Sequence, residues 1–348
     1  MGLFEMKPID ERIYNEEIAG FLPDEIIDIH THIWLEGLAA WPAESAEKRS
    51  VSWPGLVAKD NSAEDLIETY RLMFPGKKVT PLVFGNVPHL SGLPALNGYV
   101  RESAARHGFP ALFFSHPQMA PDALERELLE GGYAGVKSYL SFAPPYIPEA
   151  EIRCFDFFPP GQLEVINKLK KIVMLHIPRH GRLRDRVNLE QILEIKRNFP
   201  GVLLIIAHVG RAYCDGDVGG AFGALAAAGD LLFDISANCN RNVFEELIRA
   251  VGPERILFGS DMPILRMRTR RICEGDRYIN LVPPGLYGDV SRDAHLREVT
   301  AGEAESVTFF MYEEILAFKN AAAACGLGRS DIQKVFRDNA AAVLKAAL

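Results

Sequence analysis

Five side chains that can bind metals or move protons each end a short apolar run of this chain. They lie in the segments IIDIHTHIW, KIVMLHIPR, VLLIIAHVGR and RILFGSDMP. In chain order they are His30, His32, His176, His208 and Asp261. A buried imidazole or carboxylate is costly without a partner, so five of them at equivalent places indicate shared chemistry rather than packing.

The residue types favour a divalent metal. His30 and His32 are two positions apart, so on a strand both side chains lie on one face; Asp28 shares their parity and is expected to brace a ligand from below. Three imidazoles and one carboxylate suit Zn²⁺, and also Mn²⁺ or Fe²⁺. A lone His-x-His pair would carry little weight, so the hypothesis depends on the other strand ends.

The expected chemistry follows from the metal. A divalent ion lowers the pKa of bound water to roughly 7 and polarises a carbonyl. His208 is expected to transfer protons because an imidazole titrates near neutrality. The ligands are then His30, His32, His176 and Asp261, and Asp261 is expected to act also as a general base.

Eight apolar runs alternate with amphipathic segments and would position these side chains. The runs predict strands at 26–30, 80–84, 111–115, 135–139, 172–177, 202–208, 231–235 and 255–260. Several are apolar throughout, as expected of parallel strands buried on both faces. Eight strand–helix repeats favour a closed TIM-like (β/α)₈ barrel. An open doubly wound sheet is the alternative, weakened because no G-x-G-x-x-G follows the first run.

Two stretches exceed the minimal repeat. Residues 34–60 follow the first strand, and residues 264–302 follow the eighth. Both begin at the carboxyl ends of strands, where barrel enzymes build active sites, so we expect an inserted loop and a lid-like insertion. Residues 303–348 are Ala-rich and predict C-terminal helices. Without a repeat or a linker-like segment, residues 1–348 are expected to form one domain.

Composition narrows the partners and the compartment. The formal net charge of −8 argues against broad nucleic-acid binding but not against an anionic small substrate. No apolar run resembles a signal peptide or is long enough to cross a bilayer. The five cysteines are odd in number and form no C-x-x-C pair, so we expect free thiols in a reducing, cytoplasmic compartment.

Arginines after several strand ends suggest how an anionic substrate is held, because a guanidinium binds a carboxylate through paired hydrogen bonds. Arg179 and Arg211 are candidates, together with the cluster from Arg266 to Arg271. The alternative is that these arginines form ordinary surface ion pairs with nearby acids such as Asp215. We therefore expect a small, carboxylate-bearing substrate.

The motifs DIHTH, AHVGR and LFGSDMP resemble the amidohydrolase superfamily, most closely its amidohydrolase-2 (amidohydrolase-related) branch, and their order covers about two thirds of the chain. The resemblance implies a TIM-like barrel and a divalent metal that is commonly zinc. It also implies either hydrolysis of C–N, C–O or C–C bonds or non-oxidative decarboxylation of a carboxylated ring.

Lys137, in YAGVKSYL, leaves the number of ions open. In binuclear relatives of this superfamily a lysine on the fourth strand is carbamylated and bridges two metals, and His176 and His208 would then bind the second ion. In single-metal relatives such a lysine contacts the substrate or an interior carboxylate. We favour one ion.

Three functions follow, in order of preference. The first is hydrolysis by a metal-activated water, and the second is decarboxylation, which needs the same metal and the same His208. The third is a barrel that only binds its metal, disfavoured because His208 and Asp261 are intact. Barrel enzymes of this kind often form homo-oligomers, but the sequence identifies no interface.

Overall fold

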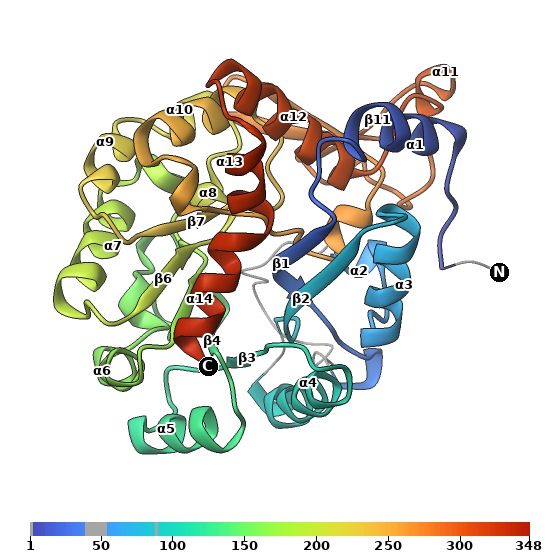
Figure 1. Cartoon of the computed structure of the whole chain (residues 1–348). Coiled ribbons are helices and arrows are strands. Elements are labelled where there is room, and N and C mark those ends of the chain that lie inside the picture. Colours follow the sequence, from blue (N-terminus) through green and yellow to red (C-terminus); the bar gives the residue numbers. More distant parts are fainter. Residues whose placement is uncertain (1–2, 39–53, 88–89) are drawn as a thin grey trace.

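The computed structural model describes residues 3–38, 54–87 and 90–348 (Figure 1). Its central strands are β1 (Glu25–His32), β2 (Lys78–Phe84), β3 (Leu112–Phe114), β4 (Gly135–Lys137), β5 (Ile172–Leu175), β6 (Leu203–Ile206), β7 (Leu232–Asp234) and β8 (Ile256–Leu257). Parallel ladders join β1 to β2 and join β3 through β8 in chain order. The predicted α/β fold with a parallel central sheet is confirmed.

Two further backbone contacts close the ladders into a ring. Val83 of β2 forms a parallel bridge with Ala111, directly before β3. Thr31 of β1 forms a parallel bridge with Met262, which follows β8. The eight strands therefore make a closed barrel rather than the open sheet considered as the alternative.

Helices between the strands, together with α12 after the last strand, cover the outside of this ring (Figure 1). They are α3 (Ala63–Met73), α4 (Leu93–His107), α5 (Pro121–Glu130), α6 (Pro160–Leu169), α7 (Arg186–Asn198), α9 (Ala221–Ala226), α10 (Arg241–Val251) and α12 (Phe310–Ala324). Shorter helices are α1 (Pro8–Ile13), α2 (Pro54–Val57), α11 (Ala301–Ala304) and α13 (Arg329–Gln333). Outward strand residues such as Val136 and Phe233 belong to the apolar layer under the helices.

The last helix, α14 (Asn339–Ala347), closes the amino-terminal end of the barrel. Its Val343 and Leu344 cluster with inward strand residues such as Leu112 and Ile205. Lys171, directly before β5, donates to the carbonyl of residue 347 at 2.6 Å. With this end filled by apolar side chains, the carboxyl-terminal end is left for polar chemistry.

The segment after β8 forms a second, smaller sheet. Its strands are β9 (Arg270–Glu274), β10 (Arg277–Val282) and β11 (Leu296–Glu298). β10 pairs antiparallel with β9 and parallel with β11. Of the other predicted insertion, 34–60, residues 39–53 lie outside the described residues; among the rest, Trp34 bridges to Asn61.

The prediction that all cysteines are free thiols was wrong for two of them. Cys214, beyond β6, forms a disulfide with Cys273 of β9. They are 59 residues apart in the chain, so the missing C-x-x-C pattern could not exclude a pair that the fold brings together. Cys154, Cys239 and Cys325 are free. Among the described helices, none is long and apolar enough to span a membrane.

A buried ion pair fastens α1 to the segment after β8. Asp10 is fully buried and accepts hydrogen bonds from Nη1 and Nη2 of Arg268 at 3.0 and 2.6 Å. Thr308 donates its hydroxyl to the same carboxylate at 2.7 Å. Removing one partner of such a pair leaves a buried charge without compensation.

We expect Asp10→Ala to lower the free energy of unfolding by about 3 to 5 kcal/mol, because Arg268 stays buried without its carboxylate. The matched control is Asp122→Ala, which removes an exposed partner of Arg126 on α5 and should have little effect. Urea unfolding of both variants at one protein concentration measures the difference. Equal losses would contradict the assigned role of the buried pair.

Candidate functional site

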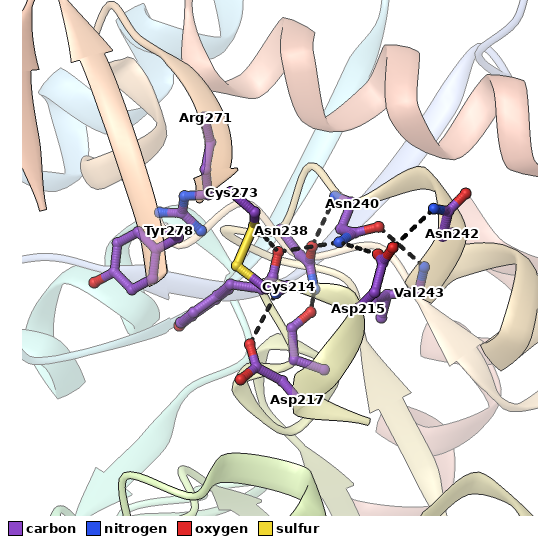
Figure 2. The surroundings of a disulfide bond; sticks show 12 residues. Cys214, Asp215, Asp217, Asn238, Asn240, Asn242, Val243, Arg271, Cys273 and Tyr278 are labelled. Carbon is purple, nitrogen blue, oxygen red and sulfur yellow. Dashed lines mark hydrogen bonds between the residues drawn. A yellow bond between two sulfur atoms is a disulfide. The ribbon is translucent and has the colours of Figure 1, made fainter. Parts of the chain in front are cut away.

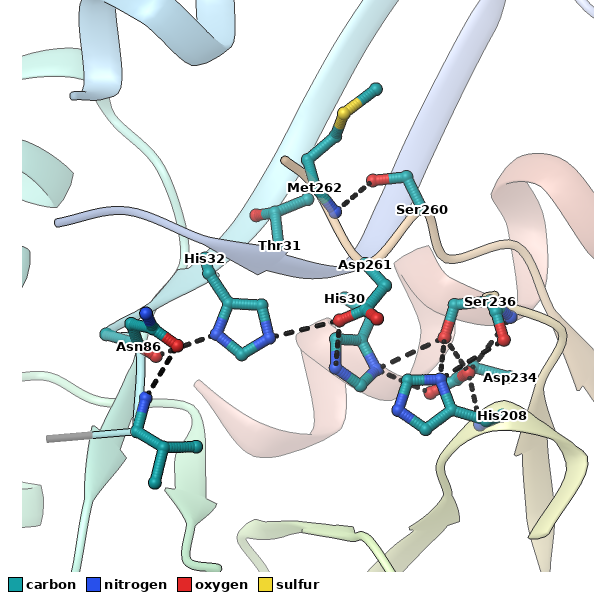
Figure 3. A network of polar contacts seen from close by, with 12 residues as sticks. His30, Thr31, His32, Asn86, His208, Asp234, Ser236, Ser260, Asp261 and Met262 are labelled. Carbon is teal, nitrogen blue, oxygen red and sulfur yellow. Dashed lines mark hydrogen bonds and ion pairs between the residues drawn. The ribbon is translucent and has the colours of Figure 1, made fainter. Parts of the chain in front are cut away.

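The five residues predicted to carry chemistry lie at the carboxyl-terminal end of the barrel. His30 and His32 belong to β1, His176 follows β5, His208 follows β6, and Asp261 follows β8. All are buried, with exposed fractions between 1% and 7%. Figure 3 shows the two β1 histidines, Asp261 and His208 facing one another.

Three of the four predicted ligands come together. Ligand atoms of His30, His32 and Asp261 lie within 4.8 Å of one another. Asp261 Oδ1 is 3.1 Å from His32 Nε2 and 3.4 Å from His30 Nε2. Gly259 packs directly against His30, because a Cβ atom there would lie 2.9 Å from the Cβ of His30.

The hydrogen bonds of Nδ1 in His30 and His32 decide what the Nε2 atoms of these rings can bind. His32 Nδ1 is 2.8 Å from the carbonyl of Gly85, and His30 Nδ1 is 2.9 Å from Asp234 Oδ2. A carbonyl and a carboxylate can only accept, so we assign the ring proton to Nδ1 in both histidines. Each Nε2 then presents a lone pair to Asp261, itself an acceptor. Three converging acceptors fit a cation.

Burial and charge hold these groups in the states that a metal needs. Burial, and then the charge of Lys137, lower the pKa of His30 to about 4. Burial opposes ionisation of Asp261, but the surrounding histidines, His208 first, outweigh it and hold the pKa of Asp261 at about 2. Metal ligands must be deprotonated, and near neutral pH both His30 and Asp261 are in that state.

Sequence reasoning missed Asp234, which ends β7. Its Oδ2 accepts from His30 Nδ1 at 2.9 Å, and its Oδ1 accepts from the backbone amides of His208 and Ser236 at 2.8 and 3.1 Å. His30, His208 and Asp234 form a second group of close ligand atoms. The sequence did contain a signal for Asp234, because this residue ends the apolar run LLFD just as Asp261 follows the apolar run ILFGS.

His208 begins a left-handed backbone turn, labelled α8 (His208–Arg211). The φ angles of its four residues are 57°, 50°, 62° and 59°. Only Gly210 adopts this conformation readily; the other residues cost about 1 to 2 kcal/mol each. The amide of His208 is held by Asp234, and the turn brings the ring to 4.8 Å from that of His30, between centroids.

The parity argument fails at Asp28. The register of β1 against β2 shifts between Asp28 and Thr31, which interrupts the two-residue alternation. The Asp28 carboxylate accepts from the hydroxyl of Tyr70 on α3 at 2.8 Å and from the amide of Ser260 at 2.9 Å. It also accepts from the His30 amide at 3.2 Å, so it braces the backbone rather than an imidazole.

His176 is the predicted ligand that stands apart. Neither group of close ligand atoms among the described residues includes it, and its ring centroid is 5.4 Å from that of His208. Its Nδ1 is buried and has no hydrogen-bond partner within the described part of the chain. A buried ring nitrogen without a protein partner fits a metal or a water molecule.

Lys137 lies inside the barrel, 2% exposed, with Nζ 5.4 Å from the ring centroid of Phe84. Burial lowers the pKa of Lys137 to about 8, against the opposing charges of Asp234 and Asp261. A buried lysine whose pKa is lowered in this way can contact an anion in its charged form or be modified at its amine in its neutral form.

The two predicted substrate arginines differ in their surroundings. Arg211 donates from Nη1 to the carbonyls of residues 177 and 178, at 3.2 and 3.0 Å. Burial, and then the charge of Arg211, lower the pKa of His176, so this guanidinium lies beside the site. Arg179 donates from Nε and Nη2 to the carbonyls of residues 152 and 151, at 3.1 and 3.0 Å.

Comparison with known proteins gives one family match. The family model described as amidohydrolase matches residues 27–271. No significant match was found among curated proteins.

Many solved structures are similar in fold, among them the following three. A 4-oxalomesaconate hydratase from Rhodopseudomonas palustris is 16% identical, with a TM-score of 0.57 over 92% of this chain and 96% of that chain. An amidohydrolase from Burkholderia multivorans with bound zinc is 14% identical, with a TM-score of 0.56 over 92% and 99%. A dihydroxybenzoic acid decarboxylase from a Polaromonas species, with bound manganese and the inhibitor 2-nitroresorcinol, is 14% identical, with a TM-score of 0.55 over 93% and 97%.

We expect Asp234→Asn to weaken zinc binding by about 10- to 100-fold, because an amide offers one accepting oxygen where the carboxylate holds both His30 and the His208 amide. The matched control is Asp230→Asn, an exposed carboxylate that pairs with Lys196. Isothermal titration of each variant with zinc chloride gives the affinities. Identical affinities for Asp234→Asn and the parent would refute the role of Asp234.

Proposed function

The chain belongs to the amidohydrolase family, whose model matches residues 27–271, and from this premise we propose a metal-dependent hydrolase. It acts on a small, carboxylate-bearing substrate with a metal-activated water, and residues 1–348 work as one barrel domain. The observation that carries this proposal is the convergence of His30 Nε2, His32 Nε2 and Asp261 Oδ1 on one point.

The proposed ligands of one divalent ion, most simply zinc, are His30, His32, His176 and Asp261. Such an ion supplies Lewis acidity, which makes water more acidic and a carbonyl more electrophilic. The donor set supports this choice, because two neutral imidazoles and an ionised carboxylate already face one another and His176 has a free nitrogen nearby. A two-ion form would need a carbamylated Lys137 and remains the alternative.

His208 is the proposed proton-transfer residue, and Asp261 the proposed general base beside it. His208 Nδ1 lies 3.1 Å from the carbonyl of Ser236, an acceptor that places the ring proton on Nδ1. The Nε2 atom is then free to accept a proton from water. Burial lowers the pKa of His208, so the ring is neutral and basic near pH 7.

The substrate carboxylate is proposed to bind at Arg211, with Arg179 as the second candidate. Arg211 is favoured because its charge acts on His176, whereas two nitrogens of Arg179 are occupied by backbone carbonyls. We propose that residues 264–302 cover this substrate site as a lid. Its β9 strand contacts the barrel rim, since Arg271 donates to the carbonyl of Ala237.

Non-oxidative decarboxylation is the second candidate reaction. The ring of Tyr139 lies 4.7 Å from that of His176, between centroids, and offers an aromatic face to a carboxylated ring. His208 would then deliver a proton to the carbon that loses carbon dioxide. The similarity of the fold to a decarboxylase of dihydroxybenzoic acid keeps this reaction open.

We expect His208→Asn to lower kcat by about 100- to 10,000-fold while zinc content stays at the parent level, because the variant loses its proton acceptor but no proposed ligand. The matched control is His180→Asn, an exposed histidine that pairs with Glu149. Turnover of a panel of carboxylated lactones, amides and hydroxybenzoates, with zinc measured by mass spectrometry, provides the comparison.

The same assay in ¹⁸O-labelled water separates the two reactions. Label in the organic product supports hydrolysis, while carbon dioxide release with no label in the organic product identifies a lyase. Parent-level turnover in His208→Asn would contradict the proposed role of His208. A parent enzyme that binds zinc but converts no member of the panel would favour a barrel that only binds its metal.

A further inference from the structure

The disulfide joins the smaller sheet to the rim of the barrel. Cys214 lies shortly after the left-handed turn at 208–211, and Cys273 lies on β9. Their Cα atoms are 5.9 Å apart, and Figure 2 shows the bond between the loop beyond β6 and the edge of the sheet. The bond therefore links the backbone that carries His208 to the sheet β9–β11.

Arg271 makes a second contact at the same seam. It lies two residues before Cys273 on β9, so both side chains lie on one face of the strand. Its Nη1 donates to the carbonyl of Ala237 at 2.5 Å. Ala237 follows Ser236, whose Oγ is 2.9 Å from His208 Nδ1. The sheet thus touches the segments that position the proposed proton-transfer residue, both at the disulfide and at Ala237.

The two sulfur atoms differ in accessibility. Cys214 is fully buried, whereas Cys273 is exposed. A cavity of about 230 Å³ opens beside Cys273, and its walls include Arg241 and Arg271. Asp215 also lines it, but its carboxylate accepts hydrogen bonds from two asparagine side chains. A negatively charged thiol approaching Cys273 would meet the guanidinium of Arg271 and that of Arg241, whose Nε donates to Glu245 at 2.8 Å.

A third cysteine, Cys239, lines the same cavity but is unsuited to attack the bond. Burial raises the pKa of its thiol well above the ordinary value. Only a thiolate is nucleophilic, so Cys239 stays inert near neutral pH. Exchange at this disulfide therefore needs a thiol from outside the chain.

We propose that Cys273 is a thiol-exchange site, at which a small anionic thiol opens the disulfide and releases the sheet β9–β11 from the barrel rim. The thiolate attacks Sγ of Cys273, a mixed disulfide forms there, and the sulfur of Cys214 leaves as a thiolate that takes a proton from water. A second thiolate attacks the reductant's sulfur and frees Cys273. Two electrons pass to the protein, and the two reductant thiols end as a disulfide.

The structure accommodates the product of this exchange. Sγ of Cys273 lies 3.3 Å from the carbonyl oxygen of Tyr213, which can accept the hydrogen of the freed thiol. The exchange itself is independent of the proposed hydrolase reaction. Only its effect on turnover rests on that proposal, through the contact of Ser236 with His208.

Thiol titration of the full-length chain tests the bond. Unfolded in guanidinium after incubation with oxidised glutathione, the parent should expose three thiols, those of Cys154, Cys239 and Cys325. After reduced glutathione it should expose five, the full number of cysteines. Five thiols under both conditions would overturn the proposal.

Hydrogen–deuterium exchange of the native protein tests the release of the sheet. Reduction by glutathione should speed exchange of β9 and β10 amides by about tenfold or more, because the sheet then opens locally. The double variant Cys214→Ser/Cys273→Ser should exchange fast without reductant, and Cys239→Ser should respond like the parent. If reduction left the hydrogen–deuterium exchange of the β9 and β10 amides unchanged, the proposed release of the sheet would be overturned. This measurement needs no substrate, so its outcome does not depend on the proposed function.

A comparison of two reductants tests the preference for an anionic thiol. Arg241→Gln should slow reduction by glutathione several-fold and leave reduction by cysteamine unchanged, because the ammonium group of cysteamine cancels the negative charge of its attacking thiolate. Equal effects on both reductants would overturn the assignment of an anionic thiol.

Discussion

Three acceptor atoms face one another at the carboxyl-terminal end of the barrel, and a positive charge between them would relieve their mutual repulsion. The ring protons of His32 and His30 are committed to Gly85 and Asp234, so both Nε2 atoms turn lone pairs toward Asp261. Burial deprives these atoms of water as an alternative partner, which makes the arrangement costly without a cation. The proposed metal chemistry depends on this convergence.

Closure of the barrel is what brings the acceptors together. The amide of Asp261 donates to the carbonyl of His30 at 2.8 Å, so a hydrogen bond that joins the end of β8 to β1 also sets two proposed ligands side by side. Asp234, from β7, then holds the His30 ring and the start of the left-handed turn with one carboxylate. Helix α14 fills the opposite end with apolar side chains, so buried polar groups concentrate at one end.

Much of this arrangement could be predicted from sequence, because most strands of the barrel contain short apolar runs and polar residues close several of them. The same alternation could not reveal the register shift that separates Asp28 from the face of His30. It could not show that His176 lies apart from the other predicted ligands, since the position of this side chain depends on the conformation of the backbone after β5. The Cys214–Cys273 bond depends on how the segment after β8 folds back, which no local pattern encodes.

Anomalous diffraction at the zinc edge, from crystals of the zinc-loaded protein, measures the central claim most directly. The account predicts one strong peak about 2.0 to 2.2 Å from His30 Nε2, His32 Nε2 and an Asp261 oxygen. A zinc ion bound elsewhere, or no peak between these three residues in a fully loaded protein, would contradict it.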